Sequence, residues 1–259
     1  MDDRVALVTG AGSGIGRATA LRFAREGMRV GVLSHTPDEV EKVVAEIRGQ
    51  GGDALDLTAD VSNSGEVKGA VDRLVSSYGR LDIVFANAGV NGVWAPIDEI
   101  QPEEWDHTVA TNLRGTYLTI HHATPHLKAA GRGSIVITSS VNGTRIFSNA
   151  GATAYACTKA AQVALAQMLA VELAKHHIRV NVICPGRIET AIQGKTERRN
   201  IEEAREPVEY PEGKIPLTDG EGGSTEEVAE LVHFLCSDSA RFISGTPVWI
   251  DGAQSVLVG

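Results

Sequence analysis

The chain has few of the features that mark membrane, secreted or nucleic-acid-binding proteins. Its longest apolar runs, such as residues 180–184, are far too short to cross a bilayer. Met1 is followed by two aspartates instead of a basic start and a long apolar stretch, so we expect no secretory signal. The formal net charge is −9, and the basic pair Arg198 and Arg199 is flanked by acidic residues. These absences argue against a membrane or nucleic-acid partner.

Cysteine is also scarce, and its spacing suits neither a disulfide framework nor a metal site. Cys157, Cys184 and Cys236 are widely separated, and an odd number cannot pair completely. Four histidines fall within residues 107–126, where exposed or interface positions explain them better than metal ligation. We therefore expect no bound metal, and buried, reduced thiols in a cytoplasmic protein.

What the chain does have is a regular alternation of short β-branched runs and longer amphipathic stretches. Most of the short runs are continuously apolar, which is typical of a parallel sheet covered on both faces. The length of 259 residues and the apolar share of 42% suit one large α/β domain. Strands are predicted at residues 5–9, 29–33, 54–58, 81–86, 134–138, 178–183 and 247–250.

Amphipathic stretches between these runs predict helices. Thr36 and Ser224 each precede a glutamate by three residues, a spacing that predicts an N-terminal capping box. Strand–helix alternation with short connections gives right-handed βαβ units. We therefore predict a single doubly wound Rossmann-type domain over residues 1–259, with a parallel sheet of about seven strands. The helices are predicted at residues 15–26, 103–128, 152–176 and 228–236, with a further one beginning after Thr36.

Residues 190–224 break this pattern. The segment is rich in charge, proline and glycine and has little apolar periodicity. A long irregular segment inside a compact domain is usually a lid or a binding loop. We predict that residues 190–224 form the substrate-binding loop, although a solvated lid that never touches substrate fits the same composition.

A glycine-rich turn follows the first predicted strand. Gly10, Gly14 and Gly16 lie between that strand and the start of the next helix. Glycines let a backbone turn tightly and approach a pyrophosphate, and a helix N-terminus supplies N–H donors to it. The position of the turn at the head of a βαβ pattern indicates nucleotide binding.

The end of the second strand bears on which nucleotide is bound. An acidic residue there would bond the ribose hydroxyls and select NAD. Here the strand ends at Ser34, which is small and neutral, and His35 and Arg17 could approach a 2′-phosphate. This pattern favours NADP. The alternative is that Ser34 and Thr36 simply cap the following helix.

Tyr155 and Lys159 are placed to act together near the start of an alanine-rich helix. Residues four apart lie on one face, one turn from each other. A free tyrosine has a pKa near ~10, and a nearby ammonium lowers it toward the range useful for proton transfer. Tyr210 and Lys214 repeat the spacing, but the proline and glycine between them make a helix implausible there.

Two serines follow the strand predicted at residues 134–138. Ligands of open α/β sheets bind beyond the carboxyl ends of the strands, where Ser139 and Ser140 would lie. A hydroxyl there can bond a carbonyl oxygen that gains charge. Ordinary turn chemistry is the alternative explanation for both residues.

Together these motifs resemble one family, the classical short-chain dehydrogenases/reductases. The resemblance runs along nearly the whole chain, in ordered motifs with family-like spacing. The matching segments are the cofactor turn of residues 9–16, Asp60-Val61, Asn87-Ala88-Gly89, Asn112, Tyr155 with Lys159, and the proline-glycine motif of residues 185–190.

The resemblance implies roles for individual residues. Tyr155 exchanges the proton at the substrate oxygen, and Lys159 lowers the pKa of Tyr155 and holds the nicotinamide ribose. Ser140, with Ser139 as the alternative, orients the carbonyl or alcohol. Asn112 keeps a water in a relay toward solvent. Hydride then passes between nicotinamide and the carbon that bears the oxygen, and the protein positions and polarises the reactants.

The same resemblance implies a small-molecule alcohol or carbonyl substrate, an NAD(P)(H) cofactor and a homo-oligomer, commonly a tetramer. The apolar residues 163–173 and 255–258 could be buried between subunits or could complete the subunit's own core. Two implied contacts have simpler alternatives, because Asp60 could cap a turn and Asn87 could serve a strand end. The cofactor-binding residues implied are Gly10, Ser13, Gly14, Ile15, Gly16, Ser34, His35, Asp60, Val61, Asn87, Ala88, Gly89, Tyr155, Lys159, Pro185, Gly186, Ile188 and Thr190.

Two other functions are compatible with such a scaffold. An epimerase or dehydratase that retains bound NAD usually has a larger C-terminal substrate domain, for which the sequence after residue 250 leaves little room. A catalytically silent nucleotide-sensing protein would tend to lose the tyrosine or the lysine, and this chain has both. We therefore expect an active dehydrogenase or reductase.

Overall fold

The chain folds around one parallel sheet of seven strands. The computed structural model describes residues 3–190, 194, 196–205 and 215–257. The strand order is β3-β2-β1-β4-β6-β7-β9, and every neighbouring pair is parallel. All seven predicted strands are present, and the order reverses between β1 and β4, which is where open α/β sheets bind ligands. The strands are β1 (Val5–Thr9), β2 (Arg29–Ser34), β3 (Asp53–Thr58), β4 (Ile83–Ala86), β6 (Gly133–Thr138), β7 (Ile178–Pro185) and β9 (Pro247–Ile250).

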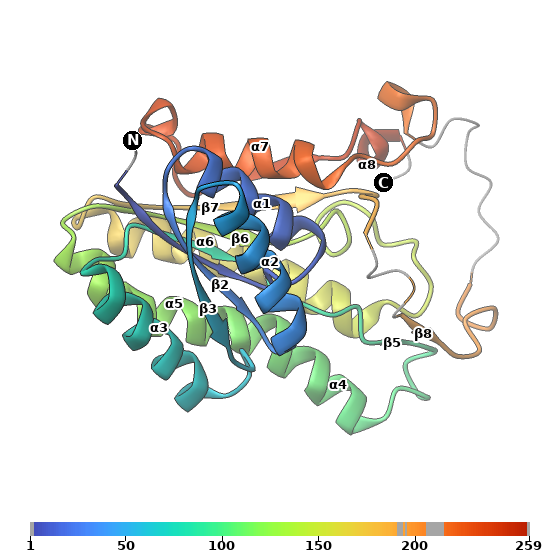
Figure 1. Cartoon of the computed structure of the whole chain (residues 1–259). Coiled ribbons are helices and arrows are strands. Elements are labelled where there is room, and N and C mark those ends of the chain that lie inside the picture. The colour runs from blue at the N-terminus through green and yellow to red at the C-terminus, as the bar shows by residue number, and fades with distance from the viewer. Residues whose placement is uncertain (1–2, 191–193, 195, 206–214, 258–259) are drawn as a thin grey trace.

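Helices cover both faces of this sheet, as the continuously apolar strands require (Figure 1). Neighbouring strand residues point to opposite faces, so Val5 and Leu7 join one apolar core while Ala6 and Val8 join the other. The first core is closed by α3 (Ser64–Tyr78), α5 (Gly115–Ala129) and α6 (Thr153–Ala174), and the second by α1 (Gly14–Arg25), α2 (Pro37–Gly49) and α7 (Thr225–Cys236).

The helix predicted over residues 103–128 is not a regular α-helix. It consists of α4 (Pro102–Val109), a π-helical turn η1 (Ala110–Arg114) and then α5. The wider turn places the side chain of Asn112 inside the protein, where it bonds the backbone of Val90. Such π-turns are frequent at functional sites, and no sequence pattern used above distinguishes them from an α-helix.

One predicted capping box forms and the other does not. Ser224 accepts a hydrogen bond from the backbone of Glu227 at 3.2 Å, and the Glu227 carboxylate accepts one from the Ser224 backbone at 2.7 Å. Thr36 occupies the N-cap of α2, but its side chain makes no capping bond. Glu39, which would complete the box, packs over Gly12 instead.

Several features were not predicted or were predicted wrongly. The helix α3 was not among the predicted segments, although Asn63 caps it by accepting from the backbone of Gly65 and Glu66. Cys184 and Cys236 are buried as expected, but Cys157 is exposed on the outer face of α6.

No described helix is long and apolar enough to cross a membrane. Within the described residues, no cluster of three or more histidine, cysteine or acidic side chains could hold a metal.

A second, small sheet brings part of the predicted substrate loop back to the domain. β5 (Val93–Trp94) pairs in parallel with β8 (Glu197–Arg198), which lies beside it in Figure 1. Arg199 anchors this loop, because its guanidinium contacts both carboxylate oxygens of Glu104 at 3.0 and 2.9 Å. The remaining short elements are η3 (Pro216–Thr218), η4 (Asp238–Ala240) and α8 (Gln254–Leu257).

Candidate active site

The glycine-rich turn after β1 forms an open cradle at the start of α1. Gly10 and Gly14 have φ values of 64° and 52°, a left-handed conformation that favours glycine. A Cβ on Gly16 would lie 2.2 Å from the Gly10 carbonyl oxygen, so no larger residue fits there. Ser13 occupies the N-cap without a side-chain bond, which leaves the first N–H groups of α1 available to an anion. This backbone fits the pyrophosphate of a dinucleotide.

Asn87 ties together the carboxyl ends of three strands beside this turn. Its side-chain amide donates to the Thr9 carbonyl at 3.1 Å and accepts from the Thr138 hydroxyl at 3.1 Å. The Thr9 hydroxyl in turn accepts from the backbone N–H groups of Asn87 and Ala88. The side chain therefore serves the strand ends, which was the simpler of the two predicted roles, while the following Ala88 and Gly89 border the cradle.

The residues predicted to meet the adenosine end lie where β2 and β3 end. Ser34 is buried at the end of β2, and His35 next to it is exposed. Asp60 accepts hydrogen bonds from the backbone and hydroxyl of Ser62, both at 2.8 Å, so it caps a turn. Val61 is buried against Gly115 of α5.

Residues 185–190 cover the other side of the glycine turn. Pro185 ends β7, and the Gly186 N–H donates to the Ile250 carbonyl at 3.0 Å. Ile188 is buried and forms an isolated bridge with Gly223. A Cβ on Gly14 would lie 3.4 Å from the Thr190 methyl group, so this segment reaches the cradle.

Ser140 and Tyr155 meet at the carboxyl end of β6. Tyr155 lies in the first turn of α6, and the Ser140 side chain is the polar neighbour that acts to lower the pKa of its hydroxyl. Ser140 also accepts from the Asn142 N–H at 3.1 Å, which fixes its hydroxyl. Ser139 points elsewhere and donates to the Lys159 carbonyl at 2.7 Å. Of the two serines, the structure thus brings Ser140 to the tyrosine.

Lys159 lies one helical turn beyond Tyr155 and is almost fully buried. Its Nζ is 5.4 Å from the centroid of the Tyr155 ring and donates to the Thr138 carbonyl at 2.8 Å. Burial lowers the pKa of Lys159 to about 8. Burial also raises the pKa of Tyr155, and the hydrogen bond from Ser140 opposes that shift only in part. The phenol is therefore protonated at neutral pH, ready to donate to an oxygen.

Asn112 connects this centre to the dinucleotide cradle. Its side chain accepts from the Val90 N–H at 2.8 Å and donates to the Val90 carbonyl and to the Thr158 hydroxyl. The amide of Gln162 donates to the Asn112 carbonyl at 2.9 Å from within α6. Gln162 is fully buried, and it was not predicted as a site residue because a glutamine on an alanine-rich helix belongs to no motif.

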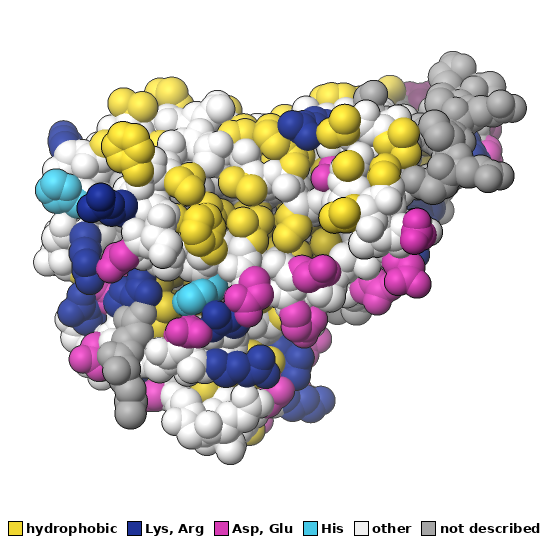
Figure 2. Space-filling model, turned by 90° about the horizontal axis from the view of Figure 1, so that it is seen from above, with side chains coloured by type: hydrophobic (Ala, Val, Ile, Leu, Met, Phe, Trp, Pro, Cys, Tyr) yellow, Lys and Arg dark blue, Asp and Glu magenta, His cyan; other side chains and the backbone are white. Residues whose placement is uncertain are grey.

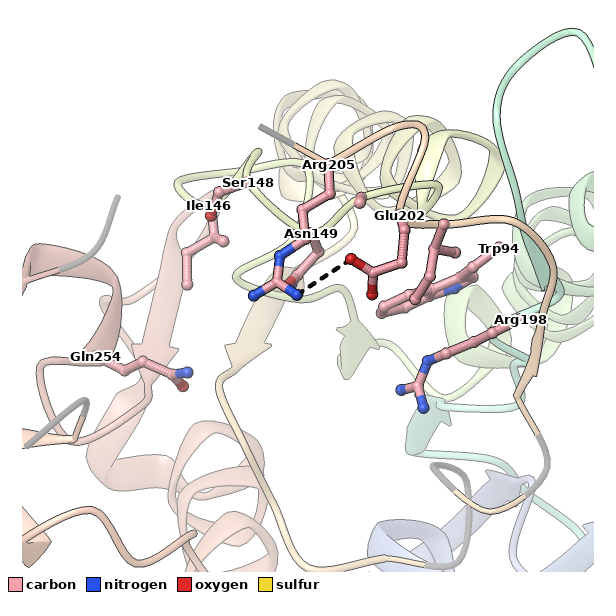
Figure 3. A pocket seen from close by; sticks show the side chains of 10 residues that line it. Trp94, Ile146, Ser148, Asn149, Arg198, Glu202, Arg205 and Gln254 are labelled. Atoms are coloured by element: carbon pink, nitrogen blue, oxygen red, sulfur yellow. Dashed lines mark ion pairs between the residues drawn. The ribbon is translucent and has the colours of Figure 1, made fainter. Parts of the chain in front are cut away.

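A cavity of about 330 Å³ is lined by a separate set of residues (Figure 3). It adjoins the reacting centre through Trp94, whose ring centroid is 6.5 Å from that of Tyr155. This wall was not predicted from the sequence, because its residues come from four separate stretches of the chain. The lining residues are Trp94, Ile146, Ser148, Asn149, Ala150, Arg198, Ile201, Glu202, Arg205 and Gln254.

Comparison with known proteins supports the chemistry that this geometry allows. A family model described as enoyl-(acyl carrier protein) reductase matches residues 10–253. The chain is 36% identical to a 3-oxoacyl-[acyl-carrier-protein] reductase of Thermotoga maritima, covering 97% of this chain and 98% of the relative. It is also 36% identical to a cyclohexanol dehydrogenase of Acinetobacter sp. strain SE19, covering 98% and 96%.

Solved structures agree closely with the fold. A 3-ketoacyl-ACP reductase of Sinorhizobium meliloti 1021 is 58% identical, with a TM-score of 0.94, covering 98% of this chain and 99% of that one. A 3-ketoacyl-(acyl-carrier-protein) reductase of Brucella melitensis, solved with NADH, is 33% identical, with a TM-score of 0.85 and coverage of 97% and 98%. These relatives are oxidoreductases, which favours the predicted hydride transfer over the silent and epimerase alternatives. The chain belongs to the short-chain dehydrogenase/reductase family.

Proposed function

We propose that this oxidoreductase interconverts a small secondary alcohol and its ketone, with Tyr155 as the acid/base. The observation that carries this proposal is the convergence of Ser140, Tyr155 and Lys159 at the carboxyl end of β6. In the direction of reduction, the protonated Tyr155 donates to the ketone oxygen while Ser140 holds that oxygen. Lys159 remains largely protonated below its pKa of about 8 and stabilises the phenolate that is left.

The glycine cradle after β1 and residues 185–190 would hold the dinucleotide, which supplies or accepts the hydride when it is bound. Lys159 would also bond the nicotinamide ribose, since a Cβ on Gly89 would lie 3.6 Å from its Nζ and little separates the lysine from the cradle. We assign Asn112 to a water relay that returns the proton to Tyr155. Residues 190–224 would form the substrate-binding loop, of which residues 191–193, 195 and 206–214 lie outside the described part.

We further propose that the dinucleotide is NAD(H). This departs from the sequence expectation, which favoured NADP on the basis of Ser34 and His35 and did not weigh Glu39. A Cβ on Gly12 would lie 2.6 Å from a Glu39 carboxylate oxygen and 3.2 Å from the Ser34 hydroxyl, so this carboxylate faces the end of β2. A carboxylate there accepts from ribose hydroxyls and repels a 2′-phosphate. Arg17 is held by Glu46 and does not balance it.

We also propose that the protein forms a homo-oligomer, because several large apolar side chains are exposed on its surface. Figure 2 shows hydrophobic side chains gathered on the face that carries α7, where Phe234, Val256 and Leu257 are exposed. Met168 and Val171 form a second exposed apolar pair on α6, at 72% and 81% exposure. Contiguous apolar surface of this kind usually marks a protein–protein interface.

The proposed function is tested by combining cofactor titration with a substrate panel. Purified protein is titrated with NADH and NADPH by nicotinamide fluorescence, and turnover is followed on cyclic ketones, keto esters, sugars and steroids. We expect saturable binding, tighter for NADH, and turnover of at least one small ketone. Absence of binding to folded protein would contradict the cofactor assignment, and turnover of bulky steroids alone would contradict the substrate class.

A further inference from the structure

One wall of the cavity presents a cation close to the reacting centre. β8 pairs with β5 so that Arg198 lies opposite Trp94, and the Arg198 guanidinium carbon is 5.4 Å from the centroid of the indole ring. Figure 3 shows the Arg198 side chain extending below Trp94 toward the open centre of the cavity. Trp94 also neighbours Tyr155, whose ring centroid is 6.5 Å from that of the indole.

The three arginines of this loop have different partners. Arg199 turns outward and is held by Glu104, with a further bond to the Glu99 carbonyl. Arg205 also lines the cavity, but Glu202 pairs with it at 3.5 Å. Among the described residues, no carboxylate forms an ion pair with Arg198, so its charge is the one left uncompensated in the cavity.

We propose that Arg198 binds a carboxylate group of the substrate, at the end opposite the carbon that reacts beside Tyr155. A guanidinium is planar and can form a bidentate bond to a carboxylate, and the cation–π contact with Trp94 holds that of Arg198 at this wall. A local cation is needed for an anionic substrate here, because the whole chain carries a formal net charge of −9. This inference rests on the proposed function, since the substrate is oriented by both Arg198 and Tyr155.

The geometry also limits the size of the substrate. Two steps, of 5.4 Å from Arg198 to Trp94 and 6.5 Å from Trp94 to Tyr155, separate the cation from the acid/base. These two steps limit the substrate to one in which a single ring or a short chain lies between the ketone and the carboxylate. A single uncompensated cation suits a monoanion better than a phosphate dianion, which would leave one charge unbalanced.

The test compares keto acids with their neutral esters. NADH-saturated protein is given 4-oxocyclohexanecarboxylate, 4-oxopentanoate and the methyl ester of each, and kcat/KM is measured with a parallel thermal-shift titration of binding. Wild type is compared with Arg198→Met, which keeps an apolar side chain over Trp94. Arg241→Met, an exposed arginine outside the cavity, controls for the change in net charge.

We expect wild type and Arg241→Met to prefer at least one acid over its ester by ~10- to 100-fold, in KM more than in kcat. Arg198→Met should remove that preference, leave ester turnover within about twofold and leave NADH affinity unchanged. Equal use of acid and ester by wild type would overturn the inference, and so would weaker NADH binding in Arg198→Met, which would place the arginine at the cofactor. If neither keto acid nor its ester is reduced, the substrate panel above decides the proposed function, and the binding titration decides whether the carboxylate is recognised through Arg198.

Discussion

The two halves of the proposed active site are built in different ways. The dinucleotide half consists of short contiguous segments after β1, β4 and β7, and its contacts are mostly backbone: a glycine turn, a helix N-terminus and strand ends tied by Asn87. The substrate half consists of single side chains from distant parts of the chain, such as Trp94, Arg198 and Gln254. The shape of the dinucleotide half is set by local structure. The shape of the substrate half depends on the position of the loop that Arg199 anchors.

The halves also differ in how function relates to stability. In the dinucleotide half, the bonds that shape the cradle also satisfy buried backbone groups, so function and folding agree. At the junction with the substrate half, Lys159 is buried with a lowered pKa, and its charged form is unfavourable in the folded state. Catalytic side chains here are thus expected to reduce stability, and cradle residues to increase it.

Of the substitutions that compare the two halves, removal of the Lys159 charge is expected to change turnover and stability most. Lys159→Met should reduce turnover by about 10²- to 10⁴-fold, because the phenolate of Tyr155 loses its neighbouring ammonium. The free energy of unfolding at pH 7 should rise by about 1–3 kcal/mol, since the burial cost of the charged lysine outweighs the lost bond to the Thr138 carbonyl. Denaturant unfolding and steady-state kinetics measure both effects.

The sign of this stability change has its own pH dependence. The folded pKa of about 8 lies below the ordinary 10.5, so the burial penalty is complete below about pH 8 and disappears as the pH approaches 10.5. The difference between variant and wild type should therefore shrink between pH 8 and 10. Lys175→Met, on the exposed end of the same helix, should show no such trend. A constant difference across this range would refute the assigned burial cost.

Ser139 and Ser140 are neighbours in the sequence, but we expect Ser140 to act in catalysis and Ser139 to stabilise the fold. Ser140→Ala should reduce kcat by about 10²-fold, because it removes the donor at the substrate oxygen, with little effect on stability. Ser139→Ala should reduce the free energy of unfolding by about 1 kcal/mol, because the Lys159 carbonyl loses a buried hydrogen bond, and it should reduce kcat far less. Kinetics and denaturation of the pair decide this, and a reversed pattern would make Ser139 the catalytic serine.

The smallest expected effect lies in the dinucleotide half. Glu39→Gln should lower the Kd ratio of NADPH to NADH by about tenfold, because it removes repulsion of the 2′-phosphate. Glu41→Gln is the matched control, since it removes the same charge from the exposed face of the same helix. Fluorescence titrations give both ratios. An unchanged ratio in Glu39→Gln would return the cofactor preference to Ser34 and His35.

Features built from contiguous segments could be predicted from the sequence, whereas features built from distant side chains could not. The seven strands, the glycine turn and the Tyr155–Lys159 pair depend on apolar runs and fixed spacings along the chain, and the sequence contains these directly. The π-turn at Asn112 and the departure of Glu39 from its capping box depend on tertiary contacts, with Val90 and Gly12 respectively. The same holds for Arg198, whose partner Trp94 lies more than 100 residues away in the sequence and pairs with it only through the β5–β8 ladder.

The central claim is that Tyr155 transfers the proton that accompanies hydride transfer. The most direct measurement is a single turnover of bound NADH with a reactive ketone, followed by stopped-flow fluorescence in wild type, Tyr155→Phe and Tyr117→Phe. We predict that Tyr155→Phe binds NADH with nearly unchanged affinity but oxidises it about 10²- to 10⁴-fold more slowly. The exposed Tyr117 on α5 should behave as wild type when changed to phenylalanine. Hydride transfer at the wild-type rate in Tyr155→Phe would contradict the account.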